Sequence, residues 1–314
     1  KHCLEVSMFP EITLTPVRSP SVPASSGIRS AGDKLRFLRC GTVMLSLMMG
    51  AASVHAETVS INAFKDATIF GTSDGSDTGN ASGMGPGLFT GTDGQLNDKR
   101  SLLQFDLSAA SIPAGSKIDS VTMSLSLGLV GGGSGVPQTI RLFDVAQSWS
   151  EGNSGSPTSS GIPGSGQGYP RGNGDSTWDY SNYNSDPAMA VKWQSGGSDL
   201  HGGNFSSTES ASTAFTTFTP GSVHTWSSAA MAADVQDWLD NPSQNNGWLL
   251  KSDEEGIRQS LLGFWSKDGA MAAGDAALAP KLEIIYTPIP EPETYAMLLA
   301  GLGLLGWRMR RLKS

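Results

Sequence analysis

The sequence is poor in cysteine. Its two cysteines, Cys3 and Cys40, both precede residue 56. If the segment before residue 57 is removed, the remaining chain has no cysteine at all. This excludes a disulfide framework, a cysteine-based metal site and a cysteine nucleophile from the mature protein. The seven tryptophans between residues 149 and 265 supply enough apolar surface for a sizeable core instead.

Charged residues are also scarce, and a basic surface is missing. Asp, Glu, Lys and Arg make up 16% of the chain, whereas about a quarter is usual. Residues 57–287 hold eleven Lys and Arg against 24 Asp and Glu, a net charge of −13. Phosphate backbones bind to clustered cations, so the sequence disfavours nucleic acid as a partner. Low charge together with abundant Gly and Ser indicates an exported, β-rich protein.

Motifs of the common enzyme classes are absent. Neither His201 nor His224 belongs to an HExxH pair, and the sequence holds no GxSxG elbow and no P-loop. We therefore expect no enzyme activity and no required cofactor. Paired carboxylates leave one alternative open, a secreted glycan-active hydrolase or lyase. Its candidate carboxylates are Asp175 with Asp179, Asp234 with Asp237, and the run Asp253, Glu254 and Glu255.

Residues 34–56 have the three parts of a secretory signal peptide. Lys34, Arg36 and Arg39 are followed by an apolar run of about a dozen residues and then by Val54-His55-Ala56. Small residues at the first and last of these positions are what a signal peptidase reads, so we predict cleavage after Ala56. The run is short for a membrane span. Residues 1–33 are rich in Pro and Ser, and we expect them to be either disordered or untranslated.

The region 288–314 combines a short motif, an apolar run and a basic end. Pro290, Glu291 and Pro292 come first, about 13 largely apolar residues follow from Tyr295 to Trp307, and the cations Arg308, Arg310 and Arg311 come after them. A comfortable membrane span needs about 20 apolar residues. In this order at the end of the chain, the parts resemble the PEP-CTERM sorting signal of Gram-negative bacteria.

The resemblance implies a specific export route. PEP-CTERM signals are recognised by an exosortase, a membrane cysteine transpeptidase, and are cut near the Pro-Glu-Pro. We therefore expect the tail to lie transiently in the inner membrane, with its arginines on the cytoplasmic side. The protein would then reach the outer cell surface or the extracellular matrix. The alternative is a permanent anchor, in which the tail is a transmembrane helix that is never cut.

The region 57–287 reads as one β-rich domain. Apolar and polar residues alternate along several short segments bounded by Gly, Pro and Ser, which is typical of an antiparallel sandwich. The expected strands lie within 59–70, 101–108, 117–129, 139–149, 213–219, 247–252, 258–266 and 280–287. One helix is expected after Ser227 or Ser228, ending at Asn241-Pro242. Residues 71–98 and 150–207 are expected to be loops.

Several segments of this region together resemble a known extracellular module. They are Asp66 to Ile69, Arg100 to Ser108, Ile112 to Gly115, Ser148 to Gly152, Thr177-Trp178 and Val235 to Leu239. In this order they resemble the DNRLRE-type domain, a jelly-roll module similar to some carbohydrate-binding modules. The resemblance implies an all-β, antiparallel jelly-roll β-sandwich at 57–287. The sequence departs from the pattern at Asn97 to Arg100 and in an insertion at 153–176.

Two kinds of binding site are expected in this domain. Calcium takes six to eight oxygen ligands from flexible acidic loops, and Asp66, Asp74, Asp77 and Asn80 are candidate ligands, with a solvated acidic loop as the alternative. Sugars stack on aromatic rings while polar side chains bind their hydroxyls. The candidate stacking residues are Tyr169, Trp178, Tyr180, Tyr183 and Trp193. For the tryptophans, burial as anchors of the long loop is the competing interpretation.

These observations predict an exported, non-catalytic surface or matrix protein. Its expected partners are a signal peptidase, an exosortase-type transpeptidase, and exopolysaccharide or other glycans.

Overall fold

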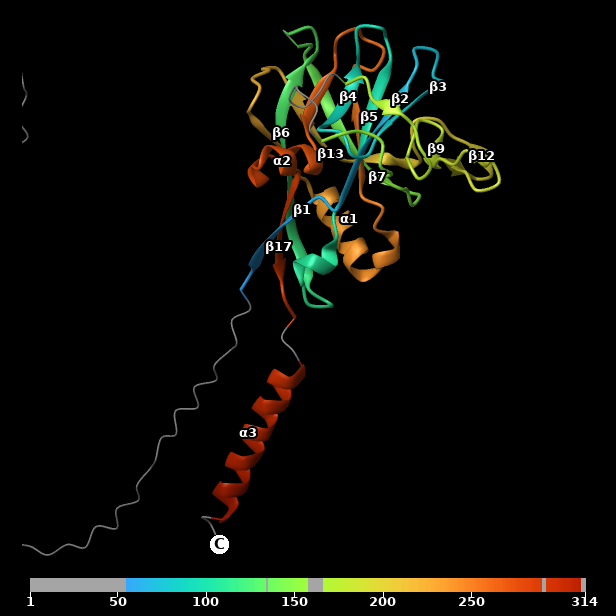
Figure 1. Cartoon of the computed structure of the whole chain (residues 1–314). Helices are drawn as coiled ribbons and strands as arrows, with labels where there is room; N and C mark the ends of the chain where they lie inside the picture. The colour runs from blue at the N-terminus through green and yellow to red at the C-terminus, as the bar shows by residue number, and fades with distance from the viewer. Residues whose placement is uncertain (1–54, 134, 158–165, 290–291, 312–314) are drawn as a thin grey trace, which may run out of the picture. The chain divides into compact units, whose positions relative to one another are not determined.

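A computed structural model describes residues 55–133, 135–157, 166–289 and 292–311, and the side chains of the last segment from residue 299 onward. The described residues form seventeen strands and three α-helices (Figure 1). The fold is therefore all-β, as the alternating segments predict. Residues 1–33 and the signal segment up to residue 54 lie outside the described residues.

Thirteen strands of the described chain join into one continuous antiparallel sheet. In chain order they are β1 (Glu57–Asn62), β2 (Lys65–Gly71), β3 (Asp77–Ser82), β4 (Gly87–Thr92), β5 (Asp98–Gln104), β6 (Lys117–Val130), β7 (Gln138–Val145), β8 (Tyr169–Pro170), β13 (Phe205–Phe215), β14 (Val223–Trp226), β15 (Trp248–Ser252), β16 (Leu262–Trp265) and β17 (Lys281–Thr287). The hydrogen-bonded path runs β1-β17-β6-β16-β4-β5-β15-β7-β13. Off this path, β14 pairs with β6, β2 with β5, β3 with β2, and β8 with β3.

The sheet folds over into a sandwich because its two ends face one core. Val121 and Met123 of β6 and Ile284 of β17 pack in the same buried cluster as Leu142 of β7 and Leu250 of β15. In β6 the side chains alternate between buried and half-buried from Val121 to Leu125, as the period of two predicts. Burying such a side chain contributes about 1.5–3 kcal/mol.

The first and last strands of the sandwich pair with each other. Glu57 lies opposite Tyr286, and Asn62 lies opposite Lys281, in an unbroken antiparallel register. The Tyr286 hydroxyl also donates a hydrogen bond to Glu57 Oε2 at 2.8 Å. β1 has no other partner strand in the described sheet, so it forms one edge.

Two helices cover parts of the sandwich. α1 (Ala229–Asp240) begins at Ser228, whose Oγ accepts a hydrogen bond from the Met231 N–H at 3.0 Å, and it ends before Pro242. Met231, Val235 and Trp238 are the buried stripe of α1, as their spacing predicts. α2 (Lys267–Ala273) is capped by Ser266 and ends at Gly274, whose φ of 69° suits a residue without a side chain.

The two expected loops contain more regular structure than predicted. Residues 71–98 hold β3 and β4, whose Gly- and Thr-rich sequences lack an apolar alternation, so the expectation of a loop there is wrong. In 150–207, β8 extends the main sheet. β9 (Tyr180–Asn182) pairs with β10 (Val191–Lys192), and β11 (Gln194–Ser195) pairs with β12 (Ser198–Asp199). This segment projects from the sandwich on the side of β3 (Figure 1).

Candidate functional site

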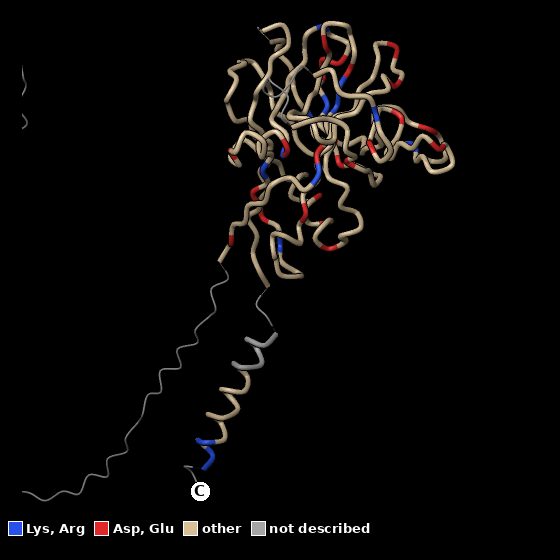
Figure 2. The backbone as a smooth tube through the Cα atoms, viewed as in Figure 1, with Lys and Arg blue, Asp and Glu red and all other residues tan. Residues whose placement is uncertain are grey.

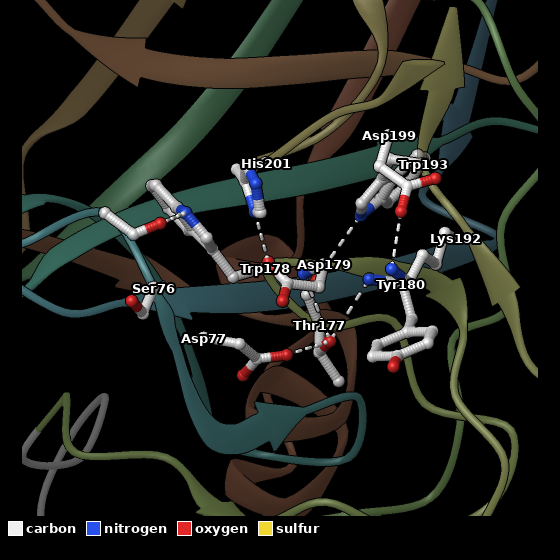
Figure 3. A network of polar contacts seen from close by, with 12 residues as sticks. Ser76, Asp77, Thr177, Trp178, Asp179, Tyr180, Lys192, Trp193, Asp199 and His201 are labelled. Carbon is white, nitrogen blue, oxygen red and sulfur yellow. Dashed lines mark hydrogen bonds and ion pairs between the residues drawn. The ribbon is translucent and has the colours of Figure 1, made fainter. Parts of the chain in front are cut away.

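A polar network around Asp77 fixes the projecting segment to the sheet. Asp77 Oδ2 accepts hydrogen bonds from Thr177 Oγ1 at 2.6 Å and from Arg171 Nη1 at 2.8 Å. Thr177 Oγ1 accepts one from the Tyr180 N–H at 3.3 Å. Figure 3 shows Thr177 between Asp77 and the backbone of Tyr180. Because Asp77 belongs to β3, these bonds set the position of Tyr180 relative to the sandwich.

Trp178 and Trp193, two of the predicted sugar-stacking residues, are buried, with 4% and 0% of their surfaces exposed. Trp193 Nε1 donates to the Thr177 carbonyl at 2.9 Å, and Trp178 Nε1 donates to the Gly75 carbonyl at 3.0 Å. The Arg100 guanidinium covers Trp178 at 4.7 Å from the ring centre. Both rings belong to the smaller of the two buried clusters. They anchor the projecting segment and offer no open face to a sugar in this structure.

Tyr180 and Tyr183 instead line a surface cleft of about 470 Å³. Their rings meet edge to face, with centroids 5.5 Å apart and planes at 77°. The Arg171 guanidinium stacks on Tyr183 at 4.2 Å. Backbone hydrogen bonds between Tyr183 and residues 174 and 175, at 2.7–2.8 Å, hold the second ring in place. The remaining walls are Asn184, Ser185, Pro187, Ala190, Val191, Lys192 and Gln194.

The cations of this cleft are already paired. Arg171 forms its ion pair with Asp77, and Lys192 forms one with Asp199. The hydrogen bond from Lys192, and then that from Gln194, lowers the pKa of Asp199. Figure 2 shows acidic residues spread over the loops of the sandwich. The tyrosine cleft therefore combines aromatic edges with amides and hydroxyls, and its positive charge is neutralised.

Three other predicted residues lie elsewhere. Tyr169 pairs with Ala81 between β8 and β3 and is not part of the cleft wall. Asp175 is fully buried, and its Oδ1 accepts from the Asn153 and Ser154 N–H groups at 2.9 and 3.2 Å. Asp179 Oδ1 lies 2.6 Å from Nδ1 of the exposed His201 (Figure 3). Asp175 thus stabilises a buried turn, whereas Asp179 lies at the surface and pairs with the imidazole of His201.

The four predicted calcium ligands do not come together. Asp74 Oδ1 accepts hydrogen bonds from Thr72 and Ser76 within its own turn, and Asp77 holds the network described above. Asn80 Nδ2 donates to the Gln167 carbonyl at 3.0 Å. Asp66 lies in a different group from these, so the spacing in sequence was a poor guide to the geometry.

Asp66 lies with Glu151 and Asp268, and one ligand atom from each of the three carboxylates falls within 4.8 Å of the others. It is the sole group of three potential metal ligands among the described residues. Lys267 Nζ already contacts Glu151 Oε1 at 2.9 Å and Asp268 Oδ2 at 2.7 Å. The Lys267 N–H donates to Asp66 Oδ2 at 2.7 Å. Burial raises the pKa of Asp66 to about 8.

This carboxylate group is not apparent from the sequence, although Asp66 was a candidate calcium ligand. Asp66 and Glu151 belong to two of the segments that resemble the DNRLRE-type domain, Asp66 to Ile69 and Ser148 to Gly152. The structure joins them directly, because the Asp66 N–H donates to Glu151 Oε1 at 2.8 Å. No spacing rule connects residues this far apart, so no local pattern in the sequence could have found the group.

The predicted processing sites flank the sandwich. Ala56 is exposed and lies immediately before β1. Pro290 and Glu291 lie outside the described residues, and α3 (Pro292–Arg311) follows them. Arg308, Arg310 and Arg311 form its last turn, visible as the basic end of the tail in Figure 2. Among the described residues no helix has both the length and the hydropathy of a membrane span.

Comparison with known proteins adds one finding. No curated protein matches the chain closely enough to count as a relative. Residues 288–311 match the PEP-CTERM protein-sorting motif, which confirms the resemblance of the tail. The DNRLRE-type resemblance of the sandwich gains no such match. The motif indicates an exported protein, carried through the membrane toward the cell surface and sorted by an exosortase.

Proposed function

We propose that this chain is a non-catalytic surface or matrix protein that binds exopolysaccharide through the tyrosine cleft. The observation that carries the proposal is the pair of half-buried rings, Tyr180 and Tyr183, fixed at the wall of a cleft by the Asp77 network and by backbone bonds. A rigid aromatic wall presents its apolar surface with little loss of conformational entropy on binding.

The other groups of the cleft favour a glycan over a purely apolar ligand. Gln194 Nε2 already donates to Asp199 Oδ1 at 3.1 Å, and Asn184 Oδ1 already accepts from the Asp186 N–H at 2.9 Å. The Gln194 oxygen and the Asn184 nitrogen then supply an acceptor and a donor, which suits sugar hydroxyls. The cations Arg171 and Lys192 are neutralised by Asp77 and Asp199. The cleft is therefore better matched to a neutral sugar than to a strongly anionic one.

The resemblance to a DNRLRE-type, carbohydrate-binding-module-like jelly roll supports the same proposal. Two of the segments that carry this resemblance are joined by the hydrogen bond from Asp66 to Glu151. A third contains Trp178, which is buried in the smaller cluster and anchors the projecting segment. On this view the sandwich provides a scaffold and the segment after β7 provides the binding surface. The sorting tail delivers that surface to the polysaccharide outside the cell.

The test is retention of the protein, isolated from its native host, on the exopolysaccharide of that host. Replacing both rings, Y180A/Y183A, should weaken retention at least tenfold, because the stacking surface is removed. The matched control, Y180F/Y183F, keeps both rings and should retain most of the binding. Equal retention of the wild type and the alanine variant would overturn the proposal.

A glycan-active enzyme is the second candidate, and the exposed pair of Asp179 and His201 is the observation that favours it. This candidate predicts release of new chain ends from the polysaccharide. Loss of that release in Asp179→Asn, with retention unchanged, would establish catalysis. We propose instead that no release occurs, because the other nearby candidate, Asp175, is committed to backbone N–H groups.

A further inference from the structure

A second cavity lies away from the tyrosine cleft, with a volume of about 300 Å³. It is formed by the turn between β1 and β2, the residues after β5, and the connection from α1 to β15. Phe64, Trp238 and Leu239 give it apolar walls, and Gln104, Asp106 and Asn245 give it polar ones. None of these six residues lines the tyrosine cleft.

In the two amide side chains of this cavity the nitrogens are hydrogen-bonded but the oxygens are not. Gln104 Nε2 donates to the Asn245 carbonyl, and Asn245 Nδ2 donates to the Phe105 carbonyl at 2.8 Å. The two amide oxygens, Gln104 Oε1 and Asn245 Oδ1, have no hydrogen-bond partner and are covered from solvent. They are two of only four such buried side-chain atoms in the described part of the chain. An unpaired buried acceptor costs about 1–3 kcal/mol.

The backbone around the cavity is fixed. Gly247 has a φ of 78°, and a Cβ at this position would lie 1.9 Å from the Leu103 carbonyl oxygen. Only glycine therefore lets the connection before β15 approach β5 closely enough to place Asn245 beside Gln104. On the other side, the Phe64 N–H donates to the Gln104 carbonyl at 2.8 Å. The side chain of Phe64 is nevertheless 59% exposed.

These features define what the cavity can accept. The uncommitted amide atoms are acceptors, so an occupant must bring donors. Asp106 adds a negative charge, and its Oδ1 already accepts from the Ser108 N–H and hydroxyl groups at 2.9 and 2.7 Å. An acidic sugar would be repelled by this carboxylate. An exposed aromatic ring at the rim offers a flat apolar surface to stack against.

We propose that this cavity is a second glycan subsite, which takes one pyranose unit carrying hydroxyl or amino donors and no carboxylate. In the bound state, the amide groups of Gln104 and Asn245 rotate and give up their bonds to the Asn245 and Phe105 carbonyls, so that their oxygens accept the sugar's donors while Phe64 stacks on the ring. The inference rests on the proposed glycan-binding function. It deepens that function, because two separate subsites let one molecule link two polysaccharide chains.

The test compares four forms of the full-length protein by calorimetric titration with neutral oligosaccharides, protonated amino-sugar oligomers and uronate oligomers. They are the wild type, Phe64→Ala, Y180A/Y183A, and Met271→Ala as the matched control, since Met271 is an exposed apolar residue outside both sites, at 72% exposure. The inference expects two sites per chain for at least one of the uncharged or amino ligands. Phe64→Ala should weaken one site at least tenfold, and Y180A/Y183A should weaken the other.

A second readout is the cross-linking of polysaccharide, followed as turbidity. Each single-site variant should still bind but lose the turbidity, and Met271→Ala should behave as the wild type. The inference is overturned if Phe64→Ala binds and cross-links normally, if Y180A/Y183A abolishes all binding, or if the Phe64-dependent site prefers uronates. If Y180A/Y183A has no effect while Phe64→Ala loses binding, the second subsite stands and the tyrosine cleft fails.

Discussion

The raised pKa of the buried Asp66 carboxyl group leads to a specific prediction about how stability depends on pH. Asp66 is 1% exposed, and its burial raises its pKa from 3.8 to about 8. The substitution Asp66→Asn keeps an oxygen that can accept from the Lys267 N–H, but it cannot ionise. The variant therefore removes the titration while leaving the local hydrogen bond in place.

The sign of the effect follows from proton binding. Between pH 4 and 8 the folded state holds a proton on Asp66 that the unfolded state has released, so the free energy of unfolding falls as pH rises through this window. A difference of about four pKa units corresponds to an upper limit of about 5–6 kcal/mol. Burial also raises the pKa of Glu151, which acts in the same direction. For Lys267, hydrogen bonds to Asp268 and Glu151 outweigh burial and raise its pKa, so it stays charged throughout.

The assay is urea denaturation of the wild type and Asp66→Asn at pH 5 and pH 9, followed by tryptophan fluorescence. At pH 5 the two should differ by about 1 kcal/mol or less, because the wild-type carboxyl is neutral. At pH 9 the variant should be more stable by several kcal/mol. The slope that Glu151 contributes remains in both proteins, so their difference isolates Asp66.

Two results would refute this reasoning. If the stabilities of wild type and variant change in parallel with pH, Asp66 is ionised in the folded state at neutral pH. If the variant is less stable than the wild type at pH 9, the carboxylate is held by a favourable charge that outweighs its burial.

Three further predictions concern stability and processing. Trp193→Ala should destabilise the sandwich by about 3–5 kcal/mol in urea denaturation, because it empties a fully buried site and frees the Thr177 carbonyl; a change below 1 kcal/mol would contradict the anchoring role. Because Lys267 already pairs with the carboxylate group, EDTA should leave the melting temperature unchanged, and a fall of several degrees would show that calcium binds. Intact mass of the native protein should correspond to a chain that begins at Glu57 and ends near Pro290–Pro292, whereas a mass that includes Arg310 and Arg311 would establish a permanent anchor.

Local signals in the sequence were enough to predict strands in which apolar and polar residues alternate and helices that begin at a capping residue. The segment 117–129 appears as β6, and the helix after Ser228 begins and ends where its cap and its proline indicate. β3 and β4 could not be predicted, because their small residues gain their stability from pairing with β2, β5 and β16. Such pairings depend on residues far away along the chain.

For the candidate sites too, local sequence signals were informative only in part, because the rest depends on residues far apart in the chain. The aromatic, glycine-rich segment places Tyr180 and Tyr183 at the cleft but Trp178 and Trp193 in the core, and residue type alone could not tell an accessible ring from a buried one. Trp193 is buried because the Thr177 carbonyl offers its indole a partner inside the fold. The group at Asp66 and the cavity at Phe64 are assembled from distant segments, and no local pattern encodes either of them.

The pairing of β1 with β17 has a consequence for the time at which the fold can form. β1 is made first and β17 last, so the edge of the sheet stays open until the whole domain has been translocated. Such long-range closure is slow, and an open strand edge invites pairing with other chains. The sorting motif follows β17 directly and emerges as the edge closes. The motif that an exosortase recognises therefore becomes accessible at about the time when β17 can first pair with β1 and complete the fold.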